Sequence, residues 1–230
     1  SSSIIINITQ RTTSLSWELD GTNTFKIPYD GKPHVPTATV TNRVGDDKCN
    51  VTVSGEQTDV GTYTATATGL SNSNYKLPAQ KTVTFEIVKA QREAPTSVTA
   101  TGTTYKGGTD GRLNNVDSSM EYRKDGENEW HSITGNTVEG LSTGKYYVRY
   151  KDSKNYYASS EKEVYVANGQ EIKVNVPASQ VGYTLSVSNT VVDYNESSTL
   201  TFKLNKGYSK TKNFAVKVNG ETVQLDNNNQ

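Results

Sequence analysis

Two histidines and one cysteine are the side chains best suited to catalysis in this sequence, and they form no catalytic set. His34 and His131 lie far apart along the chain, and Cys49 is the only cysteine. A nucleophilic site needs a serine or cysteine, a base and an orienting acid within one domain. His34 ends the turn-like run Tyr29–His34, where we expect it to stabilise the turn. We therefore expect no catalytic residue and no enzymatic activity.

Paired carboxylates are the next chemistry to consider. Glu127 and Glu129 stand close to Trp130, and Asp46 and Asp47 are adjacent in a predicted loop. Glycoside hydrolysis needs two carboxylates about 5–10 Å apart across a cleft. Thin β-modules seldom enclose such a cleft, so these carboxylates are interpreted as solvated turn charges.

The segment Gly107–Gly111 is rich in glycine and contains Asp110, but it lacks the regular acidic spacing of a calcium loop. Its glycines are explained by the positive φ angles that a tight connection needs. Calcium bound at Asp110, or at Asp46 and Asp47, is the alternative interpretation. We expect no metal site and no cofactor.

Tyrosine is the one residue type that points to recognition. Alternation along a strand places Tyr146 and Tyr150 on one face and Tyr147 on the other. An exposed Tyr147 or Tyr157 can offer a flat platform to a sugar ring or a partner protein. Cross-strand packing is the favoured alternative, so the binding residues stay unknown at this point.

The composition favours several small β-modules over one large core. Apolar residues make up 32% of the 230-residue chain and aromatic residues 9%, which is a low share for a globular protein. Thr, Val and Tyr suit a half-buried pleated surface. Short alternating runs, beginning with Ile4–Thr9, recur about every 8–12 residues with turn signals such as Asp20-Gly21 between them. The predicted fold class is all-β, with tandem immunoglobulin-like β-sandwich modules.

Three modules follow from the spacing of these runs. Residues 1–91 form the first, 92–169 the second, and 170–230 a third that lacks its last strands. Two of them contain a Gly-x-Tyr run, at Gly61–Tyr63 and at Gly144–Tyr146. This run predicts a tyrosine corner, in which the hydroxyl bonds backbone just upstream and the glycine allows a close approach. A single cysteine allows no internal disulfide, so packing must hold each module together.

Five stretches of the first module form a recognisable pattern: Tyr29–His34, Pro36–Val40, Val51–Gly55, Gly61–Ala65 and Asn74–Pro78. Through them, residues 1–90 resemble the MBG/YDG-type immunoglobulin-like repeat of large bacterial surface proteins. Through Ala94-Pro95, Lys106–Gly111, Met120–Tyr122 and Leu141–Tyr150, residues 93–168 are similar to a companion repeat that often accompanies it, and residues 182–224 are similar to a third such module. The resemblance implies a Gram-positive cell-surface protein that acts as a stalk or adhesin, and it brings no catalytic residues.

The expected function is therefore that of non-catalytic stalk or interaction modules, placed outside the cell at the wall or surface. We expect a monomer whose partners are a host glycan, mucin or matrix protein. The net charge is zero and no segment is a basic patch, so nucleic acid is a poor candidate partner. No apolar run reaches the ~20 residues of a membrane span.

Two alternatives remain open in the sequence. The modules can instead bind carbohydrate or mucin, as an accessory region of a secreted glycoside hydrolase. A lysine–asparagine isopeptide cross-link can also replace disulfides in surface modules, and it would require a lysine, an asparagine or aspartate and an assisting carboxylate buried together.

Overall fold

The computed structural model describes residues 9–226, and every regular element in that range is a β-strand. The all-β prediction is confirmed. Apart from Thr9, the predicted strand Ile4–Thr9 lies outside the described residues. The chain divides into two compact units: unit 1 contains residues 1–94 and 150–160, and unit 2 contains residues 95–149 and 161–230. Residues 150–160, which fall within the predicted second module, thus belong to unit 1.

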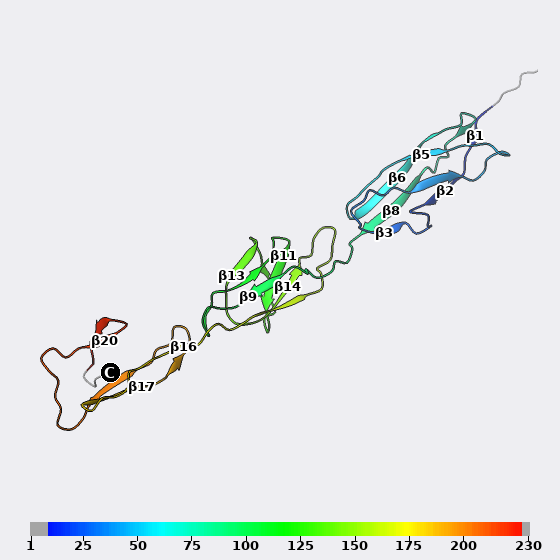
Figure 1. Cartoon of the computed structure of the whole chain (residues 1–230). Coiled ribbons are helices and arrows are strands. Elements are labelled where there is room, and N and C mark those ends of the chain that lie inside the picture. Colours follow the sequence, from blue (N-terminus) through cyan, green and yellow to red (C-terminus); the bar gives the residue numbers. More distant parts are fainter. Residues whose placement is uncertain (1–8, 227–230) are drawn as a thin grey trace, which may run out of the picture. The chain divides into compact units, whose positions relative to one another are not determined.

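The main sheet of unit 1 has four strands in the order β3-β8-β6-β5 (Figure 1). Its strands are β3 (Lys26–Pro28), β5 (Val51–Ser54), β6 (Gly61–Leu70) and β8 (Thr82–Val88). β3 runs parallel to β8, whereas the β8-β6 and β6-β5 pairs are antiparallel. Two smaller pairs complete the unit: β2 (Leu15–Glu18) with β4 (Thr37–Val40), and β1 (Arg11–Thr12) with β7 (Tyr75–Lys76).

The hydrophobic interior of unit 1 follows from the alternation of its strands. Ala65 on β6 lies in one buried cluster with Phe85 and Ile87 on β8, and all three are at most 1% exposed, as is Leu19. A second cluster contains Val40, Tyr75 and Cys49, which is a buried free thiol. Burying a side chain such as Phe85 contributes about 1.5–3 kcal/mol. These interlocked side chains hold the module together without a disulfide.

Unit 2 contains a four-stranded sheet, β12-β11-β14-β15, and a three-stranded sheet, β13-β10-β9. The strands are β9 (Thr99–Thr101), β10 (Gly111–Asn114), β11 (Met120–Lys124), β12 (His131–Ser132), β13 (Thr137–Leu141), β14 (Gly144–Tyr150) and β15 (Lys162–Val166). Both sheets supply buried side chains, with Leu113 from the smaller sheet and Val148 and Val166 from the larger, each completely buried.

Residues 171–223 of unit 2 form three separate two-stranded pairs. These pairs are β16 (Ile172–Lys173) with β18 (Val191–Val192), β17 (Tyr183–Val187) with β19 (Leu200–Leu204), and β20 (Val216–Val218) with β21 (Glu221–Val223). In this part of the described chain, Val192 and Phe202 are the buried hydrophobic residues. The apolar side chains here are thus much less covered than those in the two sheets of unit 2.

The turn predicted at Asp20-Gly21 is confirmed. Both residues have positive φ angles, 48° and 75°, and Leu19 and Thr22 exchange two backbone hydrogen bonds across them. Positive φ at both central residues defines a type I′ hairpin turn, for which Asp-Gly is a favoured sequence. The turn also sets the position of the Asp20 carboxylate.

Residues 9–226 contain no apolar helix of the length needed to cross a bilayer.

Candidate functional site

The two tyrosine corners predicted from Gly-x-Tyr are both present. The Tyr63 hydroxyl donates to the carbonyl oxygen of Asp59 at 2.8 Å, and the Tyr146 hydroxyl donates to that of Ser142 at 3.0 Å. A Cβ atom on Gly61 would lie 2.7 Å from the Tyr63 hydroxyl oxygen, so only glycine fits beneath the ring. In both corners the phenol serves the fold, since its hydroxyl bonds backbone four residues upstream.

Tyr147 lies on the opposite face of β14 from the buried Tyr146, as alternation predicts. Its ring does not stand free, because the Arg123 guanidinium lies 4.7 Å from the ring centroid. The Trp130 ring is covered in the same way, with Arg123 at 5.1 Å and Arg149 at 3.9 Å. Stacking of guanidinium on an aromatic face is itself favourable, so a ligand would have to displace these arginines from the rings.

Ion pairs fix both arginines in place. Arg149 Nε lies 2.8 Å from a carboxylate oxygen of Glu121, and Arg123 lies 3.2 Å from Glu161. The Arg149–Glu121 pair is partly buried, where an ion pair is screened less by solvent than on an open surface, whereas the Arg123–Glu161 pair is exposed. We call Trp130, Tyr147 and their two arginines the arginine–aromatic face. Its contacts make it a structural element of the sheet.

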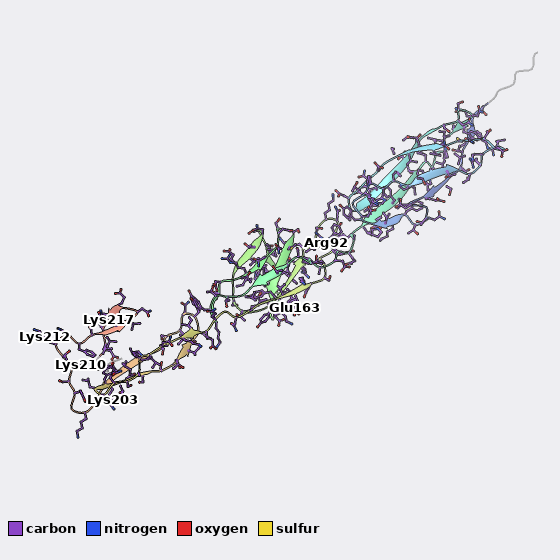
Figure 2. The ribbon with its side chains drawn as sticks, viewed as in Figure 1. Arg92, Glu163, Lys203, Lys210, Lys212 and Lys217 are labelled. Atoms are coloured by element: carbon purple, nitrogen blue, oxygen red, sulfur yellow. The ribbon has the colours of Figure 1, made fainter. Side chains whose placement is uncertain are left out.

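Tyr157, the second tyrosine that the sequence singled out, lies in the 150–160 segment of unit 1. It is 47% exposed, and Lys89 Nζ is 5.7 Å from its ring centroid. Its neighbour Tyr156 meets Tyr29 edge-on, with centroids 5.2 Å apart. The Arg92 guanidinium, labelled in Figure 2, lies 3.4 Å from the Tyr150 ring centroid. Most aromatic side chains of this segment therefore pack within unit 1.

Asp59 anchors the 150–160 segment through its carboxylate. Asn155 donates to one oxygen of Asp59 at 2.9 Å and accepts from the Val60 backbone N–H at 3.0 Å. Lys154 donates to the other oxygen of Asp59 at 2.6 Å. Hydrogen bonds from Lys154 and then Asn155 lower the pKa of Asp59 below its ordinary value. Because the Asp59 carbonyl also accepts the Tyr63 hydroxyl, one residue holds both the corner and the segment.

His34 bridges two turns of unit 1 and is 8% exposed. Its Nδ1 lies 3.1 Å from the Asp20 carboxylate, and its Nε2 lies 2.8 Å from that of Asp30. The side-chain hydrogen bond with His34 is the main cause that lowers the pKa of Asp30, followed by the Lys32 backbone N–H. The His34 backbone also exchanges two hydrogen bonds with Gln57. With both ring nitrogens facing carboxylates, His34 ties turns together.

Two of the four carboxylates considered for hydrolysis, Glu127 and Asp47, serve turns. Glu127 accepts from the Lys124 backbone N–H at 3.0 Å and lies 3.2 Å from His131 Nε2. The Lys124 bond, followed by the His131 bond, lowers the pKa of Glu127. Asp47 accepts the Tyr75 hydroxyl at 2.7 Å. Each of these acids thus has a hydrogen-bonding partner that fixes a local turn.

The described chain contains no set of side chains that matches a metal site or an isopeptide cross-link. Within residues 9–226, no three or more His, Cys, Asp or Glu side chains gather as a metal site would require. The buried polar or charged residues of this range are Thr13, His34, Thr103 and Ser159. None is a lysine, so the buried lysine that an isopeptide bond needs is not found among these residues.

A local basic stretch lies within a segment whose net charge is close to zero. Between Glu196 and Glu221 the chain has five lysines and no acidic residue: Lys203, Lys206, Lys210, Lys212 and Lys217. Figure 2 labels four of them, on β19, on β20 and on the connection between these strands. Lys217 also lines a groove of about 620 Å³ with Phe202 and Phe214. The local charge of this stretch is therefore positive.

In comparisons with known proteins, no protein-family model matches the chain and no curated protein is similar to it.

Proposed function

We propose that these residues are non-catalytic stalk and interaction modules of an adhesin-like protein on a bacterial, Gram-positive cell surface. The observation that carries the proposal is the pair of tyrosine corners, Tyr63 with Asp59 and Tyr146 with Ser142, at corresponding places in the first two predicted modules. Tyrosine corners are a hallmark of immunoglobulin-like sandwiches. The proposed topology is immunoglobulin-like, and the proposed family is the MBG/YDG-type repeat with companion repeats.

The use of the reactive side chains supports a structural role. His34 joins two turns, Glu127 holds a third, and Asp59 anchors a segment, so each of these groups already has structural partners. A general base must instead reach a proton on a substrate. Small folded modules joined by short linkers give length with little flexibility. The proposed role is to hold a recognition or catalytic domain away from the cell wall.

A spacer experiment tests the stalk role. A small binding domain is displayed on a bacterial wall anchor with the full chain, with a Gly/Ser linker of equal residue number, or with no insert. We expect capture of ligand-coated beads to rise with the full chain relative to no insert. We also expect it to exceed the capture with the linker, because a folded module resists collapse more than a flexible coil does. Capture equal to that without an insert would contradict the stalk role.

Carbohydrate binding is the second candidate function, and exposed aromatic rings beside polar groups favour it. Tyr105 and Tyr194 in unit 2 are 41% and 46% exposed, and their rings are parallel. A glycan array incubated with the full chain tests this function. Specific retention of one sugar class would support it, and a silent array would leave the stalk role alone.

A further inference from the structure

Two exposed tyrosines and one carboxylate line a small pocket in unit 2. The Tyr105 and Tyr194 rings lie 3° from parallel, with centroids 6.4 Å apart. That separation is at the long end of the range for ring pairs in contact, about 4.5–7 Å. The pocket has a volume of about 230 Å³ and is lined by Thr104, Tyr105, Gly108, Thr109, Asp110 and Tyr194. We call these six residues the tyrosine pocket.

Backbone hydrogen bonds hold both tyrosines in place. Tyr105 begins a tight turn in which its carbonyl accepts from Gly108 N–H at 3.0 Å, and the adjacent Lys106 N–H donates to Gln170. The Tyr194 N–H donates to the Lys106 carbonyl at 2.9 Å, and Lys106 Nζ lies 3.3 Å from Asp193. Side chains on a fixed backbone lose less entropy when a ligand binds. The fixed backbone therefore reduces the entropy that the two tyrosines would lose on binding a ligand.

Glycine is required at the turn beneath the pocket. A Cβ atom on Gly108 would lie 2.9 Å from the Tyr105 carbonyl oxygen and 3.1 Å from the Asp110 carboxylate. Gly107 has a φ of +77°, and its Cβ would lie 3.0 Å from that of Asp193. The glycines that suggested a tight connection in the sequence thus bring Asp110 and the tyrosines together.

Asp110 offers unused acceptor positions to a ligand. One of its oxygens accepts from the Thr104 backbone N–H at 3.0 Å, and the other accepts from the Thr104 hydroxyl. An ionised carboxylate has about four acceptor positions, so these two bonds leave about half of them open. The same bonds, the hydroxyl one first, lower the pKa of Asp110. At neutral pH the pocket therefore presents an ionised acceptor beside two aromatic faces.

We propose that the tyrosine pocket binds a single pyranose ring of a glycan. The C–H face of a sugar packs on an aromatic ring, while its hydroxyls donate to a carboxylate and exchange hydrogen bonds with threonine hydroxyls. About 230 Å³ is below the 300–1,000 Å³ of pockets for drug-sized ligands and suits one ring. The inference rests on the carbohydrate-binding function proposed above and names its site.

A quaternary ammonium ion also pairs with aromatic rings and a carboxylate. Its ammonium group carries no hydrogen-bond donors or acceptors. It would leave the Thr109 hydroxyl and the open positions of Asp110 unpaired if it displaced their water, whereas the Thr104 hydroxyl keeps its bond to Asp110. Unpaired polar groups in a filled pocket are costly. The polar lining of the tyrosine pocket therefore favours a sugar over an ammonium ion.

The test measures binding of the full chain to neutral monosaccharides and to choline by calorimetry and saturation-transfer NMR. Variants Tyr105→Ala, Tyr194→Ala and Asp110→Asn carry the prediction, and Tyr165→Ala is the matched control, because Tyr165 is 62% exposed on β15 and lies outside the pocket. We expect one sugar to bind, each alanine variant to weaken its binding by tenfold or more, and the control to leave it unchanged. Tyr105→Phe keeps the ring and should keep most of the affinity.

Each contrary outcome has its own meaning. Sugar binding that survives both alanine variants overturns the pocket and leaves the carbohydrate-binding function standing with another site. Choline that binds in place of sugar overturns the ligand class. Absence of any sugar binding by the unchanged chain removes both the pocket and the carbohydrate function, while the spacer experiment decides the stalk role separately. Far-UV circular dichroism and thermal melting of each variant show that a lost signal does not reflect unfolding.

Discussion

Unit 2 has two aromatic regions that differ in what covers their rings. On the arginine–aromatic face, Arg149 and Arg123 lie over Trp130, and Arg123 also covers Tyr147. In the tyrosine pocket, Tyr105 and Tyr194 are 41% and 46% exposed, and the nearby charge is a carboxylate. Rings stacked with guanidinium contribute to folding, whereas open rings beside acceptors can take a ligand. The alternation of residues along a strand does not show whether an outward-facing ring is covered by an arginine or open to a ligand.

Removing the indole of Trp130 should have the largest effect on stability. Trp130→Ala takes away the surface on which two arginines stack and part of the sheet's cover, and we expect a loss of about 2–3 kcal/mol in the free energy of unfolding. Tyr105→Ala in the tyrosine pocket should cost less than about 1 kcal/mol, because its ring is exposed. Urea unfolding followed by circular dichroism measures both. Equal losses would erase the distinction between the two regions.

Breaking the ion pair beneath the indole should cost somewhat less. Arg149→Ala leaves the Glu121 carboxylate, only 16% exposed, without its partner at 2.8 Å. We expect a loss of about 1–2 kcal/mol. The double variant with Glu121→Ala should lose less than the sum of the two single changes, because the unpaired charge is then gone. If the loss in the double variant equals the sum of the losses in the two single variants, Arg149 and Glu121 are not coupled.

Local sequence patterns were sufficient to predict the positions of some of these tyrosine side chains. Gly-x-Tyr predicted both tyrosine corners, since the tyrosine and the backbone that its hydroxyl bonds lie within a few residues of each other. Alternation likewise placed Tyr147 opposite Tyr146. The guanidinium cover on Tyr147 was not predicted, because Arg123 comes from β11, a different strand of the sheet.

Long-range placement explains the rest of what the sequence did not predict. Tyr105 and Tyr194 are far apart in the chain. The backbone bond from Tyr194 to Lys106 and the ion pair between Lys106 and Asp193 bring them together. Strand β10 was not predicted, because Gly-Arg-Leu-Asn has the composition of a turn. Its place between β9 and β13, with Leu113 fully buried, overrides that local preference.

The hydroxyl of the corner tyrosine Tyr146 should contribute a smaller amount to the free energy of unfolding. Tyr146→Phe removes the hydroxyl that donates to Ser142 at 3.0 Å and keeps the ring. We expect a loss of about 1 kcal/mol, and Tyr63→Phe should lose a similar amount in unit 1. Chemical unfolding of the two variants compares the corners. A negligible loss in both would remove the structural role that we assign to these hydroxyls.

The smallest expected effect is that of acidic pH on sugar binding by the tyrosine pocket. Because the pKa of Asp110 is lowered in the folded chain, its bonds to Thr104 contribute stability above the ordinary value of 3.8 and lose it as pH falls through the lowered pKa. Sugar affinity should stay constant from pH 7 to about pH 5 and fall only in stronger acid. Asp110→Asn should flatten this acid limb, as followed by NMR titration. An unchanged limb would assign the pH dependence to another group.

The most direct test of the contrast between covered and open rings is NMR of the full chain with labelled tyrosine rings, titrated with the sugars that it retains. The signals are assigned by single Tyr→Phe substitutions. The account predicts that Tyr105 and Tyr194 shift with a common binding curve, while Tyr147 and Tyr157 keep their positions. Shifts at Tyr147 or Tyr157, with Tyr105 and Tyr194 unmoved, would contradict it and place recognition outside the tyrosine pocket.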